Sequence, residues 1–486
     1  MSDDGNRFDV VVVGCGIAGL SAAVSACHQG ANVAVLERAT FEERGGNTRY
    51  TEGFLRMNTD LEVSDDFETE LAMTGSGYLD PALVHETAAP YEQWPAIVRS
   101  MNFVDPEVIM TFSSEAGPTL QWLKGFGARF DNLPTPHITH SFPKLVTVGG
   151  GLQLVEILTA AAEECGVTFF YETTAKELIQ DREGAVVGLK STGRRNKVTE
   201  FDARAVILAS GGFEGNPEML AHYLGPKAVN LRPTARGGYY NRGEGIRMAL
   251  DIGAAPCGNF SNFHAEPVDP RSGVTEPLIM IFPYGILVNK DGERFVDEAS
   301  RALDRLYEPV SYRILEQRDG IAYLILDEKI EDVENYQVGV RTDQPPIIAD
   351  TIAELAEKLE VSAPALEATV ASFNAACPAG PFSLMELDGM TTAGVKPAKS
   401  NWARPIDVAP FRAYPIIAVN TFTFGGLKVN AHAQVINTDG DVIPGLYAGG
   451  EVIGLFYRSY AGATSVLRGA TFGRLGGAHA AQYQAP

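Results

Sequence analysis

The fold of this chain is decided near its N-terminus by Phe8-Asp-Val-Val-Val-Val-Gly14-Cys-Gly16-Ile-Ala-Gly19, which is followed by an alanine-rich segment and by Val33-Ala-Val-Leu-Glu37. The valine run predicts a buried strand, and the two later segments predict a helix and a second strand. In such a unit Gly14 permits the tight turn, Gly16 lets backbone amides approach a pyrophosphate, and Gly19 lets helix and strand pack closely. Glu37 ends the second strand, where a carboxylate accepts hydrogen bonds from ribose hydroxyls. We therefore expect a dinucleotide-binding unit rather than the alternative, a glycine-rich surface turn.

Length and charge limit the class of protein. A chain of 486 residues exceeds a comfortable single hydrophobic core, so we expect two domains. A hydrophobic content of 45% and a charged content of 21% are typical of a globular enzyme. The formal net charge of -22 opposes binding to nucleic acid or to an anionic membrane surface, and the one basic run is Arg194-Arg195. A small anionic substrate would therefore need a local basic pocket.

The N-terminal residues and the cysteines bear on compartment and metal content. Residues 1–7 are mostly polar and lead directly into the first strand, so we expect no signal peptide. Glycines interrupt the apolar stretch from Val10, which argues against a membrane span. The five cysteines show no Cys-x-x-Cys spacing, which excludes the usual iron–sulfur, c-haem and structural zinc motifs. We expect a reduced, cytoplasmic protein with no metal site, in which Cys15 and Cys27 are small packing residues.

The later part of the chain contains two kinds of sequence pattern. Residues 205–211 again read as a buried strand that ends in glycine, and the chain after residue 412 returns to short strands, glycine turns and a Gly/Ala-rich helix. Residues 259–411 differ, because prolines, aromatic residues and an acidic helical stretch indicate a separate mixed domain. The sequence thus predicts an α/β protein in which residues 1–258 and 412–486 form one dinucleotide-binding domain and residues 259–411 form an insertion.

Two C-terminal features favour FAD over NAD. The segment Gly445-Leu-Tyr-Ala-Gly-Gly-Glu451 places an acidic side chain at a strand end, where it can bind a second polyol, the ribityl chain. A helix that begins near Thr464-Ser465 can point its positive end at the flavin N1/C2 carbonyl region. We therefore expect FAD as the cofactor.

Four motifs together carry a family resemblance: the glycine loop at residues 14–19, Gly46-Asn-Thr, Val206-Ile-Leu-Ala-Ser-Gly-Gly-Phe-Glu-Gly-Asn-Pro and Gly243-Glu-Gly-Ile-Arg-Met-Ala-Leu-Asp. They resemble the soluble fumarate reductase and 3-ketosteroid dehydrogenase superfamily of flavoproteins over nearly the whole chain. Residues 422–429 and 454–457 are most similar to its tricarballylate dehydrogenase-like branch. The resemblance implies a Rossmann-like FAD-binding domain built from both chain ends, with an inserted α+β capping domain for the substrate.

The resemblance also implies how FAD is held. No histidine stands near Thr48, at the position where membrane fumarate reductases attach flavin covalently, so we expect non-covalent FAD. The expected cofactor residues are Gly14, Gly16, Ile17, Ala18, Gly19, Glu37, Arg38, Gly46, Asn47, Thr48, Ala209, Ser210, Gly211, Gly450, Glu451, Ser465 and Val466.

Enzymes of this superfamily move a hydride between flavin N5 and a carbon beside a carbonyl or carboxylate, while a side chain moves the proton. His264, in Asn262-Phe-His-Ala-Glu-Pro, resembles the family's substrate-binding histidine, with a structural cap residue as the alternative. Thr275, in the pair Thr275-Glu276, resembles a second substrate-binding residue, because the family carries a Thr-Glu pair after its histidine. His264 and Thr275 are therefore candidates for contact with the substrate.

The proton-transfer residue stays open. The segment Gly292-Glu-Arg-Phe-Val-Asp-Glu298 matches a family segment in which the arginine and the last glutamate are structural. Just beyond it the family carries a proton-transferring arginine or tyrosine. Plain alignment puts Ala302 there, so Arg301, Arg305 and Tyr307 are the neighbouring candidates.

Departures near the C-terminus bear on the substrate. Phe422 stands where fumarate reductases have a carboxylate-binding histidine, and Tyr460 stands where they have a carboxylate-binding arginine. Residues 458–464 instead resemble the ketosteroid dehydrogenase segment in which a tyrosine hydroxyl and an amide polarise a ketone. Carried over, Tyr460 and the Thr464 amide would hold a carbonyl oxygen, and Arg458 could bind a carboxylate. The alternatives are a tyrosine packed beside the isoalloxazine and an exposed arginine.

These observations predict a FAD-dependent dehydrogenase (desaturase) that acts on a C–C bond next to a carbonyl of a small, cyclic oxo acid or ketone. An enzyme for a di- or tricarboxylate, like tricarballylate dehydrogenase or fumarate reductase, is the alternative, and a flavoprotein that only relays electrons is a third. The electron acceptor is open among oxygen, a quinone and a partner protein. We expect a small-molecule substrate, no nucleic acid and no membrane span.

Overall fold

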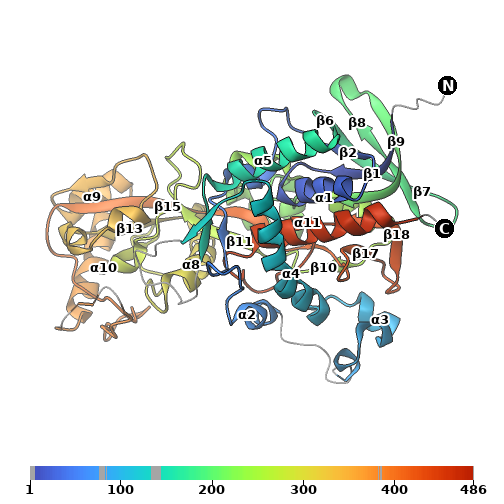
Figure 1. Ribbon diagram of the computed structural model, residues 1–486. Helices are drawn as coiled ribbons and strands as arrows, with labels where there is room; N and C mark the ends of the chain where they lie inside the picture. The colour runs from blue at the N-terminus through green and yellow to red at the C-terminus, as the bar shows by residue number, and fades with distance from the viewer. Residues whose placement is uncertain are drawn as a thin grey trace.

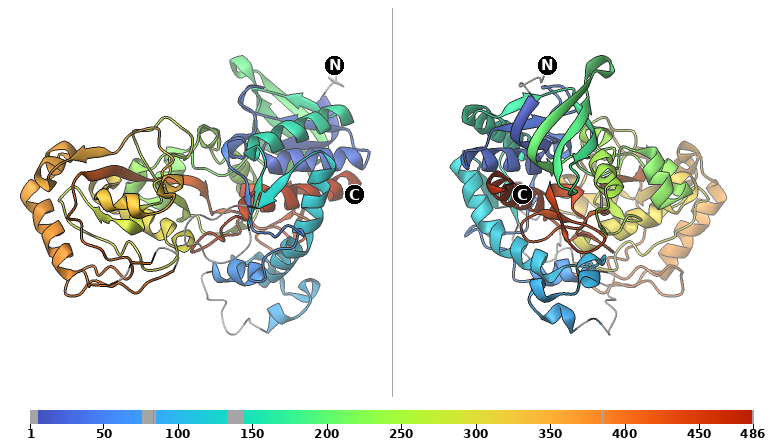
Figure 2. Two further views of the ribbon diagram at one scale, coloured as in Figure 1. Left: turned by 60° about the vertical axis from the view of Figure 1, so that its left-hand side comes forward. Right: turned by 90° about the vertical axis from the view of Figure 1, so that its right-hand side faces the viewer.

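Two lobes make up the protein, and the computed structural model describes residues 6–75, 83, 85–132, 144–380, 382–383 and 386–484. Figure 1 shows the N- and C-terminal regions together in one lobe, while the middle of the chain, in yellow and orange, forms the other. The two further views in Figure 2 show the same separation.

The first lobe is built on an eight-stranded sheet. Its central strand β1 (Arg7–Val13) pairs in parallel with β2 (Val33–Leu36) on one side and with β9 (Val198–Leu208) on the other. The C-terminal strand β18 (Val442–Ala448) pairs in parallel with β9. The remaining strands are β6 (Thr168–Phe170), which is parallel to β2, and the antiparallel β7 (Thr174–Gln180), β8 (Val186–Thr192) and β17 (Gln434–Ile436). The predicted α/β class is confirmed, with strands from both chain regions in one sheet.

Small residues let the first and last helices of this lobe pack closely. In α1 (Ile17–His28) the residues Ala18 and Ala22 face Gly473 and Gly477 of α11 (Ser465–Gln482), at positions where a side chain would meet backbone atoms of α1. Figure 1 shows the two helices side by side. The other α-helices of the lobe are α2 (Phe67–Met73), α3 (Ala96–Ser100), α4 (Pro106–Gly125), α5 (Gly150–Cys165), α6 (Pro217–Leu224) and α7 (Glu244–Asp251).

The second lobe contains a five-stranded antiparallel sheet. Its long strand β15 (Phe411–Thr423) pairs with β11 (Phe263–Val268), β13 (Ile321–Leu326) and β14 (Ile347–Ala349). β12 (Ile286–Val288) pairs with β13, and the helices are α8 (Tyr307–Leu315), α9 (Ile352–Leu359) and α10 (Ala363–Ala376). The domain boundaries at 258/259 and 411/412 stay a prediction, and β15, which crosses the second boundary, pairs within this sheet.

Two small sheets complete the described strands. β3 (Phe54–Leu55), β5 (Leu145–Thr147) and β4 (Phe130–Asn132) form one, and β10 (Pro256–Cys257) with β16 (Gly426–Leu427) forms the other. Within the described part of the chain, no helix is both long and apolar enough to cross a bilayer.

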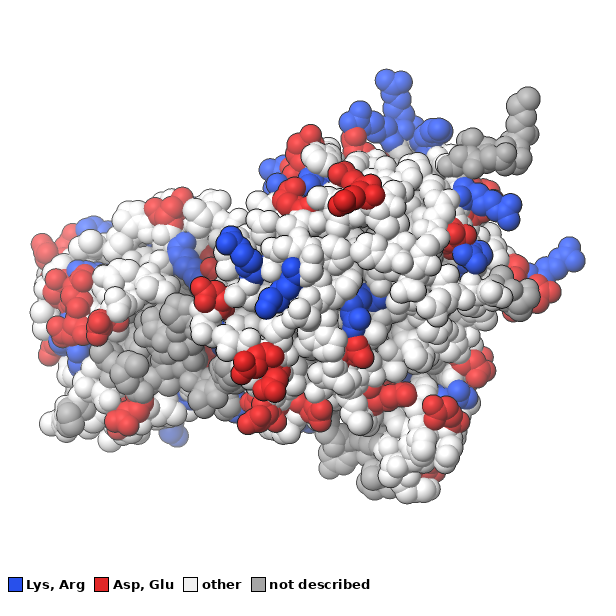
Figure 3. Space-filling view, viewed as in Figure 1, with Lys and Arg blue, Asp and Glu red and all other residues white. Residues whose placement is uncertain are grey.

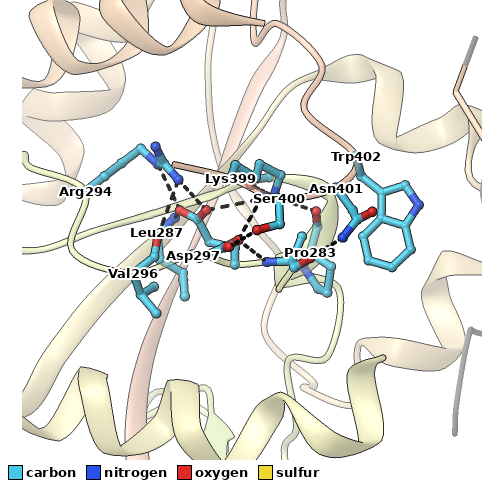
Figure 4. Close-up of polar contacts among 12 residues, drawn as sticks. Pro283, Leu287, Arg294, Val296, Asp297, Lys399, Ser400, Asn401 and Trp402 are labelled. Atoms are coloured by element: carbon cyan, nitrogen blue, oxygen red, sulfur yellow. Dashed lines mark hydrogen bonds and ion pairs between the residues drawn. The ribbon is translucent and has the colours of Figure 1, made fainter. Parts of the chain in front are cut away.

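A buried charged cluster ties the loops of the second lobe to its sheet (Figure 4). Glu298 is fully buried, accepts a hydrogen bond from the Leu287 amide at 2.9 Å and forms an ion pair with Arg294 at 2.6 Å. The Nζ atom of Lys399 donates to the carbonyl oxygens of Pro283 and Gly285, at 2.7 and 2.9 Å. The Arg294–Glu298 pair braces one loop, and the contacts of Glu298 and Lys399 join loops to β12 and to residues 283–285, which fits the structural role expected for Arg294 and Glu298.

The expectation that all cysteines are reduced is wrong for two of them. Cys27, in the last turn of α1, and Cys165, the last residue of α5, form a disulfide. The two residues are 138 positions apart, and they meet because the C-terminal ends of both helices lie together. Cys27 is therefore a cross-link, while Cys15 is a buried free cysteine.

Candidate active site

A cavity follows the carboxyl edge of the central sheet and takes residues from both ends of the chain. We call it the dinucleotide cavity. Of the residues expected to contact a cofactor, all but Gly19 line it: Gly14, Gly16, Ile17, Ala18, Glu37, Arg38, Gly46, Asn47, Thr48, Ala209, Ser210, Gly211, Gly450, Glu451, Ser465 and Val466.

The turn between β1 and α1 has the geometry that its glycines predict. Gly14 has a φ of +106°, and a Cβ there would lie 2.4 Å from the Ala209 carbonyl oxygen. Gly19 lies behind the turn, where a Cβ would be 2.0 Å from the Gly14 oxygen, so its role is packing. The first turn of α1 holds no acidic residue, and the Ile17 amide donates to Thr48 Oγ1 at 3.0 Å. The positive end of α1 is therefore suited to a phosphate group.

Glu37 is held rigidly at the end of β2. Its two carboxylate oxygens accept the amides of Cys15, at 3.0 Å, and of Ala39, at 2.8 Å. Burial raises the pKa of Glu37, and these backbone hydrogen bonds oppose the increase. Each oxygen keeps a further lone pair, so the side chain can still accept hydrogen bonds from ribose hydroxyls. Its neighbour Arg38 is bound to Glu244 at 3.0 Å.

Glu451 lines the dinucleotide cavity, and a second buried acid, Glu214, lies close to it. One oxygen of Glu451 accepts the Thr423 amide at 2.7 Å. Glu214, which was not predicted from the sequence as a site residue, accepts the side-chain amides of Asn47 and Asn241, each at 2.6 Å. Burial raises the pKa of both carboxyls. The Ser210 hydroxyl is buried in the cavity wall and has no hydrogen-bond partner in the described structure, which leaves it available to a ligand.

A further cavity of about 410 Å³ lies between the two lobes. It is lined by residues of the first lobe, such as Arg56, and of the second, such as His264, and we call it the interlobe cavity. It shares six wall residues with the dinucleotide cavity: Thr51, Glu276, Thr421, Phe422, Ser465 and Val466. A ligand in one cavity is therefore adjacent to a ligand in the other.

His264 is a buried histidine clamped by two carboxylates. Its Nδ1 lies 2.6 Å from Glu308 Oε2, and its Nε2 lies 3.5 Å from Glu266 Oε1 and 3.4 Å from the Tyr307 hydroxyl. Burial acts to lower the pKa of His264, but the hydrogen bonds with Glu266 and Glu308 outweigh it and raise the pKa to about 9. The imidazole is therefore protonated near neutral pH.

Aromatic rings surround this histidine. The ring of Tyr460 lies 4.4 Å and that of Phe422 5.1 Å from the His264 ring, measured between centroids. The Tyr460 oxygen accepts the amides of Thr464 and Ser465, at 2.9 and 3.0 Å, and its O–H donates to Ser465 Oγ at 3.1 Å. The Thr464 amide, which the sequence predicts as a partner of Tyr460 in holding a carbonyl oxygen, thus donates to Tyr460 itself.

Glu276 stands on the wall that the two cavities share. It has a φ of +50°, which is unusual for a residue other than glycine. Burial, followed by the negative charges of Glu266 and Glu52, raises its pKa to about 8. A carboxyl group with such a pKa can both take up and release a proton near neutral pH.

The structure brings six of the nine predicted catalytic and substrate-binding residues to the interlobe cavity: His264, Arg301, Arg305, Tyr307, Phe422 and Tyr460. Thr464 is buried behind the wall, while Thr275 and Arg458 are exposed and do not line it. Glu266 and Glu308 were not predicted from the sequence, which marked Glu276 only as the neighbour of Thr275 in a Thr-Glu pair that resembles the family's. Glu266 could have been found, because residues two apart in a strand share a face and His264 lies two positions before it. Glu308 has no such signal, because it reaches His264 from a helix 44 residues later.

Comparisons with known proteins identify the family of the chain. A family model described as "FAD binding domain" matches residues 9–467. Vinyl phenol reductase of Lactiplantibacillus plantarum is 27% identical over 98% of this chain and 97% of its own length. A fumarate reductase (cytochrome) of Shewanella frigidimarina is 28% identical over 98% of this chain and 78% of its own length.

Two further proteins act on cyclic ketones according to their names. The 4-oxocyclohexanecarboxylate 2-dehydrogenase of Sinomonas cyclohexanicum is 27% identical over 95% of this chain and 90% of its own length. The solved structure of a 3-ketosteroid-Δ4-(5α)-dehydrogenase from Rhodococcus jostii, in complex with 4-androstene-3,17-dione, has a TM-score of 0.69 and 25% identity, and covers 99% of this chain and 98% of that chain.

Proposed function

The chain belongs to the FAD binding domain family and is a FAD-dependent oxidoreductase, and we propose that it is a dehydrogenase that desaturates a C–C bond next to the ketone of a small cyclic oxo acid or ketone. The residues present fit the cofactor, since the unpartnered Ser210 hydroxyl and the acceptors of Glu37 and Glu451 all line the dinucleotide cavity. When bound, FAD supplies the hydride acceptor.

The observation that carries the proposal is the aromatic wall around His264. Tyr307, Phe422 and Tyr460 place three ring faces or edges around the histidine, each with its centroid within 5.6 Å of the imidazole. A flat or cyclic substrate can pack against such rings, whereas an open-chain polycarboxylate gains little from them. This wall also includes Phe422, which borders both cavities, so the substrate ring would lie beside the cofactor.

We assign carbonyl binding to Tyr460 and His264. The Tyr460 oxygen accepts two backbone amides, and its O–H proton, which here donates to Ser465 Oγ at 3.1 Å, would turn to the ketone oxygen when the substrate binds. The protonated His264 adds a positive charge nearby. Together these donors stabilise negative charge that develops on a ketone oxygen when the neighbouring C–H loses its proton.

We assign proton removal to Glu276. It borders both cavities, and its raised pKa of about 8 places it near the working range of a general base. Tyr307 suits this role less well, because burial raises its pKa well above the ordinary value and keeps its hydroxyl protonated. Tyr307 instead lies 3.4 Å from His264 Nε2, where it orients the imidazole.

An anaerobic substrate screen tests the proposal. The purified holoprotein is mixed with saturated cyclic ketones, cyclic oxo acids, succinate or tricarballylate, and bleaching of the bound flavin is followed by absorbance. We expect bleaching with cyclic ketones or oxo acids and formation of the conjugated enone by mass spectrometry. Rapid bleaching by succinate or tricarballylate alone would overturn the proposal and favour the polycarboxylate alternative.

A further inference from the structure

The interlobe cavity brings together side chains of both charges on a chain whose net charge is -22. Five basic side chains line it, Arg56, Lys144, Arg301, Arg305 and Arg341, together with six acidic ones, Glu52, Glu70, Glu266, Glu276, Asp304 and Glu308. The face of the molecule in Figure 3 also shows acidic and basic side chains interspersed, with no broad basic patch among the residues coloured there. A local basic pocket is what a small anionic substrate needs on such an acidic protein.

Four of the five cations are already paired. Arg56 is buried and contacts Asp66 at 2.6 Å. The other three pair across the lobes: Lys144 contacts Asp304 at 3.6 Å, Arg341 contacts Glu52 at 2.6 Å, and Arg305 contacts Glu70. These pairs neutralise their members, and the last three also hold the lobes together around the cavity.

The three acidic residues of the cavity that do not pair with an arginine or lysine have other interactions. Glu266 and Glu308 both contact His264, and their two charges face its one positive charge. Glu276 is held largely protonated at neutral pH by burial and by Glu266 and Glu52.

Arg301 is the fifth basic side chain of the interlobe cavity. It makes no hydrogen bond or ion pair with any part of the chain that the structure describes, and it lines the cavity while remaining exposed. It lies between β12 and α8, whose first two residues, Tyr307 and Glu308, contact His264. An unpaired guanidinium at the open side of a cavity offers a planar fork that matches a carboxylate.

We propose that Arg301 binds the carboxylate of a cyclic oxo acid whose ketone faces Tyr460 and His264, so that the substrate is an anion and not a neutral ketone. The inference rests on the proposed function, and it gives Arg301 a role in binding instead of the proton transfer considered from sequence. The exposed Arg458, which the sequence suggests for the carboxylate, is then not needed.

A matched pair of substrates tests the inference. Steady-state kinetics with a dye acceptor are measured for 4-oxocyclohexanecarboxylate and for its methyl ester, which differ in the carboxylate charge. For Arg301→Gln we expect KM for the acid to rise by roughly 10- to 100-fold, the range for loss of a charged hydrogen bond. The kcat for the acid and both constants for the ester should change little, and Arg301→Lys should restore part of the affinity for the acid.

A binding measurement separates affinity from turnover. Cyclohexanecarboxylate has the carboxylate but no ketone, so it can bind without reacting, and its Kd is measured by calorimetry with the holoprotein. We expect Arg301→Gln to weaken this binding by a factor similar to the rise in KM. Thermal unfolding of the variant, compared with the original protein, shows that the fold is retained.

Each other outcome has a distinct meaning. An unchanged KM for the acid in Arg301→Gln would overturn the inference, and so would a kcat loss shared by acid and ester, which indicates proton transfer. A rise in KM for the acid in Arg458→Gln, with none in Arg301→Gln, would place the carboxylate at Arg458. If no cyclic ketone or oxo acid of the screen reduces the flavin of the original protein, the proposed function itself fails.

Discussion

The Nδ1 atom of His264 and the Oε2 atom of Glu308 lie 2.6 Å apart, and this contact joins strand β11 to helix α8 in a buried part of the second lobe. The other oxygen of Glu308 accepts the backbone amide of Tyr460 at 3.2 Å. One carboxylate therefore positions both groups that we assign to the substrate carbonyl.

We expect Glu308→Gln to lower stability in a pH-dependent way. The folded-state pKa of His264, about 9, is above its ordinary value of 6.5, so the stabilisation is fully present below pH 6.5 and is lost as the pH rises through 9. The whole shift corresponds to about 3 kcal/mol, but Glu266 and Glu308 both produce it, so Glu308→Gln should remove only a part of that amount. Urea unfolding of both proteins should therefore show a larger difference at pH 6 than at pH 10. Glu316→Gln, which removes an exposed partner of Arg313 just beyond the same helix, is the control and should cost less than about 1 kcal/mol.

The pH dependence of turnover should be bell-shaped. Glu276 must lose its proton to act as a base, so kcat/KM rises with pH towards about 8, and His264 must keep its proton, so kcat/KM falls above about 9. Glu276→Gln should remove the rising limb and lower kcat by ~10²-fold or more. A rising limb that persists in this variant would assign proton removal to another group.

Tyr460→Phe should lower kcat by roughly 10²-fold, as the loss of one donor to a developing oxyanion does. The substitution also leaves the amides of Thr464 and Ser465 without their present acceptor, so a modest loss of thermal stability should accompany it. Tyr239→Phe, at an exposed tyrosine, is the matched control. Equal rates in the two variants would remove Tyr460 from the mechanism.

Glu37→Gln should weaken FAD binding by roughly 10- to 100-fold, because the neutral amide is a poorer acceptor and its NH2 group would face a backbone N–H. The increase in flavin fluorescence on release measures the affinity. The exposed Glu42→Gln is the control, and we expect no effect from it.

Thiol titration tests for the disulfide between Cys27 and Cys165. The denatured protein, kept without reductant, should show three free thiols, those of Cys15, Cys257 and Cys377, and reduction should expose the two of the disulfide. Cys165→Ala should destabilise the fold by about 2–4 kcal/mol, because the bond closes a long loop in the unfolded chain. Five thiols before reduction would show that the bond is absent.

Local sequence was sufficient for the cofactor half of the protein. The first dinucleotide-binding unit takes up about thirty consecutive residues, from the strand that begins near Phe8 to the acid Glu37. The glycine that its turn requires, Gly14, and the hydrogen-bond acceptor Glu37 can therefore be recognised from local sequence. Glu451 and the helix start at Ser465 follow the same local rules, and they indicate FAD.

The chemistry of the interlobe cavity was decided by tertiary structure. His264, Glu276, Glu308 and Tyr460 lie on separate elements, and no local spacing specifies that the first is clamped by Glu308 or that the second reaches both cavities. The same holds for the choice between Arg301 and Arg458. The sequence shows two arginines near the site. The packing of the two lobes decides which of them lines the cavity, and it decides which acids pair with the other basic residues of the cavity. Sequence by itself thus determined the cofactor and the class of fold, because backbone geometry is encoded locally, while packing alone decided which charges meet.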